Sequence, residues 1–138
     1  MKDIVAVGDI DSMIKSVTTI NEYDGFINSF LDNTEFSDPH LTARIEAGEK
    51  LEDMIARNDH HCFVTENANG ISGLFILLEI PKEKYLEMLI GITRDESAVE
   101  ELLSFIAKNY PGYEADFVFN PRNYLIKDGL TKRGADFD

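Results

Sequence analysis

The side-chain types best suited to chemistry gather at His60-His61-Cys62, where two imidazoles and a thiol follow one another. Imidazole nitrogen and thiolate sulfur are ligands that zinc prefers. The segment is β-prone, however, and adjacent side chains of a strand point to opposite faces, so His61 and Cys62 cannot easily bind one ion. The chain also has no second cysteine. We therefore predict no metal site here, and we expect His60 to pair with Asp59 at the surface.

Cys62 is the only cysteine, which excludes a disulfide framework. It is either a small buried hydrophobe or a thiolate nucleophile, and the second role needs an adjacent base that the sequence does not show. The glycines form no Gly-x-Gly, no phosphate-binding loop and no Gly-x-Ser-x-Gly elbow. Dinucleotide binding and serine-hydrolase chemistry are therefore not indicated.

Hydrophobic spacing predicts the elements that would position these residues. Residues 4–7 are typical of a short strand. Residues 13–20 have the i, i+3, i+4 spacing of a helix, and a second run at 23–31 continues this helical pattern. Asp38-Pro39 indicates a helix start, and that helix runs through Ile55 and ends near Asn58-Asp59. The elements that follow are strands at 61–65, 71–80 and 85–92, with a turn at 67–70 between the first two, then a helix at 99–108, a strand at 115–119 and a helix at 123–133. Residues 135–138 begin a last extended segment.

The predicted order is therefore β-α-α-β-β-β-α-β-α-β. The run from Gly73 to Leu78 is apolar on both faces, which indicates a sheet covered on both sides. No linker, repeat or low-complexity stretch divides the 138 residues, so we predict a single domain over 1–138. The fold class is α/β with a mixed sheet, and the order differs from the alternation of a Rossmann fold.

The charge balance limits the partners. Lys and Arg number 13, Asp and Glu number 26, and the formal net charge is −13. A chain this acidic repels phosphate backbones, so we expect no nucleic-acid partner, and it would gain little from an anionic membrane surface. The sequence has no apolar run of membrane-spanning length and no visible secretory signal, so a cytoplasmic location is expected.

The element order, with a three-strand meander followed by helix, strand and helix, resembles the GNAT family of N-acetyltransferases over nearly the whole chain. Many members carry Asn, an aromatic residue seven positions on, and Gly eleven positions on. Here Asn123 and Gly134 fit that spacing, and Leu130 stands in the aromatic position. The resemblance implies a GNAT-like acyl-CoA N-acyltransferase fold and transfer of an acetyl group from acetyl-CoA to a small-molecule or peptide amine.

The resemblance also implies a cofactor site at the junction of the third meander strand and the following helix. Backbone amides of that strand would hold acetyl-pantetheine, and amides at the helix start would hold pyrophosphate. Arg94 fits the first position of the family's Arg/Gln-x-x-Gly-x-Gly/Ala loop, but Ser97 and Val99 stand where glycines would be. The cofactor-binding residues implied in this way are Ile90, Ile92, Arg94, Ser97, Ala98, Val99 and Asn123.

The residues around this loop point to a weakened acetyl-CoA site. Thr93-x-x-Glu96 and Ser97-x-x-Glu100 each have capping-box spacing, and a capping box uses the amides that would otherwise meet an anion. Asp95 and Glu96 add negative charge at the same place. Arg94 either holds one phosphate or pairs with a nearby carboxylate.

For catalysis, the resemblance implies Glu87 as the general base and Glu79 as the second choice. A base needs a raised pKa, and the alternative for each glutamate is a solvated carboxylate near a strand end. Strand alternation predicts Tyr85, Glu87 and Leu89 on one face and Leu86, Met88 and Ile90 on the other. The family's proton-donating tyrosine corresponds to Leu130, which has no proton to give.

Two further groups of residues each have two interpretations. The first is a basic group that either contacts an anionic group such as the 3′-phosphate of CoA or forms the solvated side of a short helix. Its members are Arg122, Lys127, Lys132 and Arg133. The second group either lines an acceptor pocket or belongs to the core: Tyr23, Phe26, Phe30 and Phe36.

The family normally adds two strands after its last helix, and residues 134–138 are too short for both. The resemblance therefore implies incomplete C-terminal strands. A homodimer partner or a second GNAT domain would complete the fold, as in the N-terminal half of a tandem protein. The alternative to an acetyltransferase is then a non-catalytic GNAT-fold module for binding, dimerisation or partnership within a larger enzyme.

Overall fold

The computed structural model describes residues 12–30, 48, 50–93, 95–117, 126 and 130. Within this part of the chain, five strands form one sheet in sequence order. The strands are β1 Ser12–Val17, β2 His60–Asn67, β3 Gly70–Ile80, β4 Tyr85–Thr93 and β5 Glu114–Phe117. The α-helices are α2 Asp24–Asn28, α4 Leu51–Ile55 and α5 Glu96–Asn109, and the 3-10 helices are η1 Asn21–Tyr23 and η2 Pro81–Glu83.

The sheet is mixed. β1 to β4 pair in antiparallel fashion, each strand with the next, whereas β4 and β5 are parallel. A parallel neighbour requires a crossover connection, and α5 supplies it. Gly70 begins β3 after the tight turn with φ of 112°, a backbone conformation that favours glycine. The predicted meander, its hairpin turn and the mixed sheet are confirmed.

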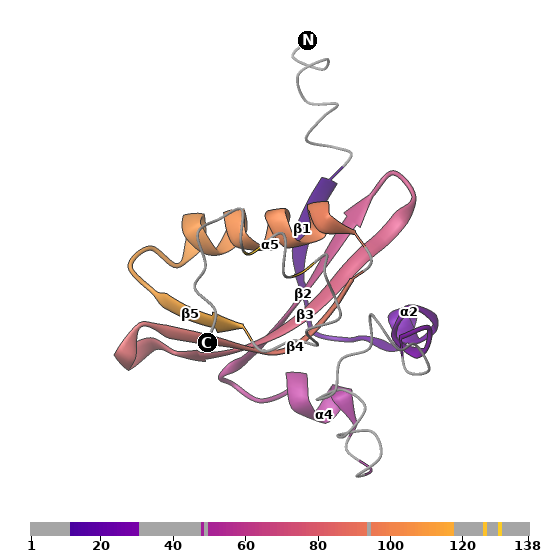
Figure 1. Ribbon diagram of the computed structural model, residues 1–138. Coiled ribbons are helices and arrows are strands. Elements are labelled where there is room, and N and C mark those ends of the chain that lie inside the picture. Colours follow the sequence, from indigo (N-terminus) through magenta and orange to yellow (C-terminus); the bar gives the residue numbers. More distant parts are fainter. Residues whose placement is uncertain are drawn as a thin grey trace.

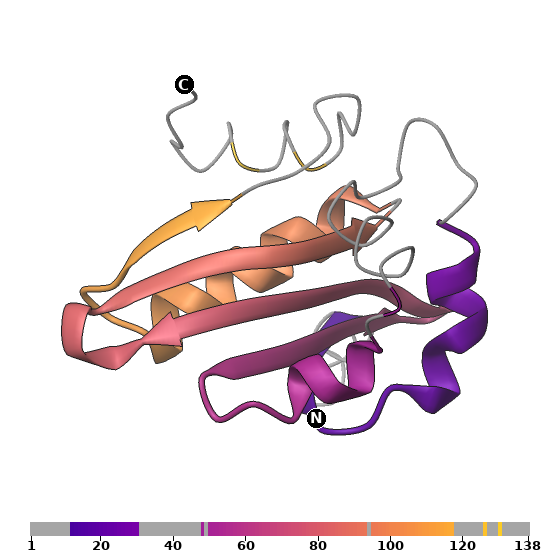
Figure 2. The ribbon, with the colours of Figure 1, turned by 90° about the horizontal axis from the view of Figure 1, so that it is seen from below.

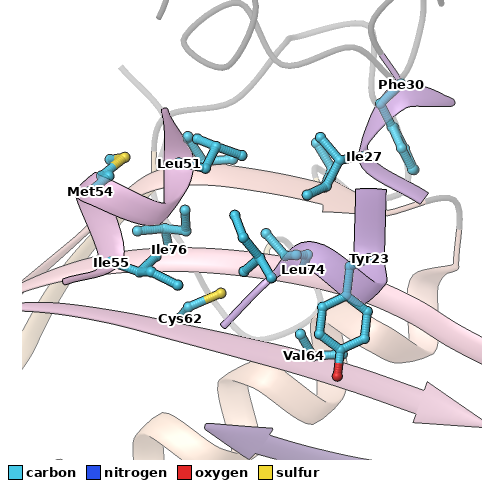
Figure 3. Close-up of a cluster of buried hydrophobic side chains, with 13 residues drawn as sticks. Tyr23, Ile27, Phe30, Leu51, Met54, Ile55, Cys62, Val64, Leu74 and Ile76 are labelled. Carbon is cyan, nitrogen blue, oxygen red and sulfur yellow. The ribbon is translucent and has the colours of Figure 1, made fainter. Parts of the chain in front are cut away.

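Helices cover both faces of this sheet. Figure 1 shows α5 on one face and α2 and α4 on the other, and Figure 2 views the second face with α4 and α2 in front. We call the side chains between the sheet and α2/α4 the first core, and those beneath α5 the second core. The first core comprises Ile20, Tyr23, Ile27, Phe30, Leu51, Met54, Ile55, Cys62, Val64, Leu74, Ile76, Ile90 and Ile92 (Figure 3). The second comprises Phe63, Phe75, Leu77, Leu86, Met88, Ala98, Leu102 and Ile106.

The sequence of β3 is apolar at successive positions because both faces of this strand are buried. Leu74 and Ile76 point into the first core, and Phe75 and Leu77 point into the second. All four side chains are at most 1% exposed. Burying a side chain of this size contributes about 1.5–3 kcal/mol relative to leaving it exposed. The two-sided burial predicted for this strand is confirmed.

The N-terminal part of the described chain departs from the prediction. Residues 12–17 form the edge strand β1, not a helix. Ile14 packs against the second core and Val17 against the first, so residues three apart lie on opposite sides of the chain. A helix would have placed them on one face. Pairing with β2 supplies the backbone hydrogen bonds of β1, and Ile14 and Val17 pack on opposite sides of the sheet while Met13 stays exposed.

β4 contains an irregularity that changes the predicted faces. Ile76 pairs with Ile90 but Leu77 pairs with Met88, so Leu89 is the extra residue of a β-bulge. Leu86 and Met88 therefore lie in the second core, whereas Ile90 and Ile92 lie in the first. The predicted placement of Ile90 on the face of Leu86 and Met88 is wrong because the bulge shifts the alternation by one residue.

α5 contains the predicted helix at 99–108 and ends before Pro111-Gly112, and residues 114–117 form β5 where a strand is predicted at 115–119. The helix predicted to start at Asp38-Pro39 is not continuous. Gly48 lies in a turn with φ of 84°, Lys50 is extended, and α4 spans only Leu51–Ile55. Tyr23 and Phe30 are buried and Phe26 packs against them, which is the core role. Residues 4–7, Phe36, most of 38–50 and most of 123–133 lie outside the described residues, although Ile126 and Leu130 are helical and buried.

Candidate functional site

Glu87 lies in the first half of β4, on the face that carries α2 and α4. It stands between Leu78 of β3 and Asp116 of β5 in the register of the sheet. Leu86 and Met88, its chain neighbours, point into the second core, so the half-buried Glu87 side chain points the other way. No hydrogen bond or ion pair joins its carboxylate to another residue in the described part of the chain.

Tyr85 lies on the same face of the sheet as Glu87, and the pKa of its hydroxyl responds to the charges on that face. The Tyr85 hydroxyl donates a 2.7 Å hydrogen bond to Oδ2 of Asp116. That bond, then desolvation, and then the nearby carboxylates of Asp116, Glu87 and Glu114 raise the pKa of Tyr85 to about 12. The face around Glu87 is therefore acidic, and it suits a positively charged amine.

Glu79 lies near the end of β3 on the opposite face, toward α5. Its Oε1 is 2.7 Å from Nε2 of His61, and its Oε2 accepts a 2.7 Å hydrogen bond from the Tyr113 hydroxyl. The bond to Glu79 raises the pKa of Tyr113, because the phenol is the donor. Both oxygens of Glu79 are thus engaged in joining β2, β3 and the segment after α5. This arrangement is typical of a structural carboxylate.

Asp95 is the N-cap of α5, the helix that follows β4, and its side chain caps the start of that helix. Its Oδ1 accepts hydrogen bonds from the Ser97 amide at 3.0 Å and the Ser97 hydroxyl at 2.8 Å. The Ala98 amide donates to the Asp95 carbonyl at 3.0 Å. The two predicted capping boxes, which began at Thr93 and Ser97, are wrong. Ser97 already lies inside the helix, so the cap is Asp95 itself.

Asp95 is also held from the sheet. Its Oδ2 accepts a 2.9 Å hydrogen bond from Nδ2 of Asn67, at the end of β2. Its amide donates to the buried Thr93 hydroxyl at 2.9 Å, and that hydroxyl donates to the Ser72 carbonyl at 2.7 Å. Sequence reasoning missed the Asn67 contact, because 28 residues separate the partners and no local pattern marks such a pair.

The side chains predicted to flank the cofactor are core residues. Ile90 and Ile92 are fully buried in the first core, and Ala98 lies in the second. Val99 is buried against Ile126 and Leu130 in a third cluster. Any contact of these four with a ligand would have to come from the backbone. Arg94 and Asn123 lie outside the described residues, as do Arg122, Lys127, Lys132 and Arg133.

Leu130 occupies the position that the resemblance gives to a proton-donating tyrosine. Its side chain is 3% exposed and packs with Val99 of α5. A polar donor at this position would have to replace an apolar contact, so Leu130 serves packing and supplies no proton.

The Glu87 carboxylate has no hydrogen bond to another residue in the described part of the chain, so it is available to accept a proton. The start of α5 does not fit a pyrophosphate, because the Ser97 amide already donates to a carboxylate and Asp95 and Glu96 place two negative charges in the first turn.

The remaining chemical candidates have structural roles. His60 Nδ1 lies 2.7 Å from Oδ1 of Asp59, which confirms the predicted pairing, but only the Asp59 side chain is at the surface, because the His60 side chain is 8% exposed. Cys62 is 1% exposed, and burial raises the pKa of its thiol to about 12, so the buried-hydrophobe role is confirmed.

Among the described residues, no three His, Cys, Asp or Glu side chains gather to bind a metal. None of the helices there is both long and apolar enough to cross a membrane.

A shallow pocket lies at the other end of α5 from Asp95. Its lining residues are Leu103, Ile106, Ala107, Tyr110, Pro111, Gly112 and Tyr113. None of them is a predicted site residue, so this pocket does not coincide with the predicted site.

Known structures match this fold, although no protein-family model and no curated protein sequence matches the chain. A point mutant of TTHA1254 from Thermus thermophilus matches with a TM-score of 0.57 and 15% identity over 90% of each chain. The aminoglycoside acetyltransferase meta-AAC0020 from an uncultured soil metagenomic sample, in complex with sisomicin, matches with a TM-score of 0.56 and 15% identity, over 94% of this chain and 93% of that one. At such identities the likeness concerns the fold. This chain is a mixed α/β domain of GNAT-like fold, structurally similar to an acetyltransferase over nearly its whole length.

Proposed function

We propose that this chain is a GNAT-like N-acetyltransferase domain with a degenerate pyrophosphate loop. The reaction class is transfer of an acetyl group from acetyl-CoA to the amine of a small molecule or peptide, with cofactor binding weakened at α5. The observation that carries the proposal is the structural match to an aminoglycoside acetyltransferase over 94% of the chain.

The position of Glu87 supports the acceptor half of this proposal. An amine becomes nucleophilic only after it loses a proton, and a carboxylate beside the reacting strand can accept that proton, directly or through water. Glu87 has no competing hydrogen bond in the described part of the chain, whereas both oxygens of Glu79 are engaged. Glu87 is therefore the better candidate base, and Asp116 and Glu114 beside it would attract a cationic amine.

A second function has its own support: a non-catalytic GNAT-fold domain that acts with a partner, such as a second copy or a second GNAT domain. Asp95 at the start of α5 opposes pyrophosphate, and Leu130 provides no proton for a departing thiolate. In this alternative, the partner domain holds acetyl-CoA, and this chain contributes binding surface or stability.

An acetylation assay distinguishes the two functions. The protein is incubated with millimolar acetyl-CoA and a panel of primary amines that includes an aminoglycoside and a lysine-containing peptide, and release of the CoA thiol is measured. Turnover that falls at least tenfold in Glu87→Gln but persists in Glu83→Gln, an exposed glutamate of η2, supports the enzyme. Turnover that is unchanged in Glu87→Gln contradicts the assigned base. The absence of thiol release with every amine favours the non-catalytic domain.

A further inference from the structure

We infer that Asp95 is a built-in anion that takes the place of a cofactor pyrophosphate at the N-terminus of α5. The inference deepens the proposed function, on which it rests, because it identifies what weakens that site. Instead of an anion bound from solution, the chain supplies its own carboxylate to the positive end of the helix.

The charge argument begins with the helix. α5 has 14 residues, and the aligned peptide dipoles of such a helix leave a partial positive charge at its first turn. The free amides there are the donors that phosphates use in other proteins. In this chain, the Ser97 amide donates to Oδ1 of Asp95 at 3.0 Å, and the Ala98 amide donates to the Asp95 carbonyl at 3.0 Å. Two amides of the first turn that could meet a pyrophosphate are therefore already in use.

The carboxylate is fixed by more than local capping. A capping side chain held only by its own helix could rotate away when a ligand arrives. Here Oδ2 of Asp95 also accepts a 2.9 Å bond from Nδ2 of Asn67 on β2. The Asn67 amide is itself oriented, because its Oδ1 accepts from the Asn69 backbone amide at 2.8 Å. Displacing Asp95 would therefore break contacts to two elements.

The backbone of Asp95 is anchored as well. Its amide donates to the Thr93 hydroxyl, which is fully buried and donates in turn to the carbonyl of Ser72 on β3. The capping residue is thus tied to β2 through its side chain, and to β3 through Thr93 of β4. An incoming pyrophosphate would meet a fixed carboxylate and not a flexible one, and repulsion between them would weaken binding.

The test measures ligand binding and needs no activity. Coenzyme A and inorganic pyrophosphate are titrated by calorimetry into the wild-type protein, Asp95→Gly and Asp95→Asn. Glycine removes the carboxylate and frees the Ser97 amide, and it is tolerated at an N-cap. Asparagine keeps an oxygen for the Ser97 amide but removes the charge. Asp53→Asn changes the net charge equally at an exposed position of α4, and circular dichroism melts verify that every variant is folded.

We expect at least a tenfold gain in affinity for both ligands in Asp95→Gly, a smaller gain in Asp95→Asn and no change in Asp53→Asn. Equal affinity in the wild type and Asp95→Gly would overturn the inference, and so would a folded Asp95→Gly that binds neither ligand at millimolar concentration. These outcomes are independent of the acetylation assay. A wild type that binds CoA tightly and acetylates amines would refute the inference and the weakened cofactor site, but not the acetyltransferase activity. A gain in Asp95→Gly without any turnover would refute only the enzyme.

Discussion

Glu79 and Glu87 lie on opposite faces of the same sheet. Glu79 pairs with Leu86, whose side chain lies in the second core beneath α5. Glu87 pairs with Leu78 and lies on the face that α2 and α4 cover. The two glutamates therefore cannot act on one substrate. Glu79 contacts His61 and Tyr113 at the α5 side, and Glu87 stands beside Asp116 on the other side.

This separation predicts different costs of substitution. Glu79→Ala should lower the free energy of unfolding by about 1–3 kcal/mol, because Tyr113 and His61 lose a partly buried acceptor. Glu87→Ala should change it by no more than about 0.5 kcal/mol, as is usual for a side chain without specific contacts. Urea unfolding at pH 7 measures both. Equal costs for the two variants would show that the assigned contacts of Glu79 do not hold.

Substitution by alanine should have opposite effects on the stability of the protein at two glycines. A Cβ at Gly73 would lie 2.7 Å from Oγ1 of Thr65 and 2.9 Å from the ring of Phe75, and both neighbours are buried. Gly73→Ala should therefore cost about 1–3 kcal/mol through overpacking. A Cβ at Gly25 in α2 meets nothing within 4 Å, so Gly25→Ala should stabilise the protein by about 0.5 kcal/mol. Thermal melts of the pair give the comparison, and a destabilised Gly25→Ala would contradict the placement of α2.

Tyr85 should make stability depend on alkaline pH. Its pKa is about 12 in the folded protein, chiefly because the phenol donates to Asp116, and about 10 for an ordinary tyrosine. A raised folded pKa means that the contribution of Tyr85 is fully present below pH 10 and is lost as pH rises from 10 through 12. The urea midpoint should therefore fall more between pH 9 and pH 11.5 in the wild type than in Tyr85→Phe.

The ultraviolet titration of tyrosinate provides the control for that experiment. In Asp116→Asn the acceptor loses its charge, so the pKa of Tyr85 should move back toward 10. If the phenolate absorbance of the wild type and Asp116→Asn rises over the same pH range, the hydrogen bond to Asp116 does not control Tyr85.

Cys62 should resist alkylation until the protein unfolds. Its thiol is 1% exposed and has a pKa of about 12 because of burial, so little thiolate exists at pH 8 and iodoacetamide has no access to it. We expect modification to be roughly a hundredfold slower in native protein than in 8 M urea. Because the chain has one cysteine, intact-mass spectrometry reads the result directly. Rapid labelling under native conditions would exclude Cys62 from the first core.

The sequence predicted the middle of the fold well because local signals and tertiary packing agree there. β3 is apolar on both faces and has both faces covered, and the helix predicted at 99–108 lies within α5. β1 was mistaken for a helix because Met13, Ile14, Val17 and Ile20 fit a helical spacing, and only the pairing with β2 decides between the two states. Hydrogen bonding to a strand that is distant in the sequence produces no periodic pattern in the local sequence, so such a pairing is not visible there.

The candidate site was predicted less completely for the same kind of reason. The prediction that the helix is capped by the chain's own side chains is confirmed, but the capping residue is Asp95 and not Thr93 or Ser97. Asp95 acts together with Asn67 of β2, a partner that becomes adjacent only when the sheet forms. Likewise, the bulge at Leu89 arises from the register between β3 and β4, so alternation alone placed Ile90 on the wrong face.

The bulge at Leu89 also bears on how the protein unfolds. Before it, β4 contributes Leu86 and Met88 to the packing beneath α5, and after it the same strand contributes Ile90 and Ile92 to the packing against α2 and α4. The two layers therefore share one central strand and cannot melt independently. Amide hydrogens in both halves of β4 should exchange with the same opening free energy, so the two hydrophobic layers behave as a single cooperative unit.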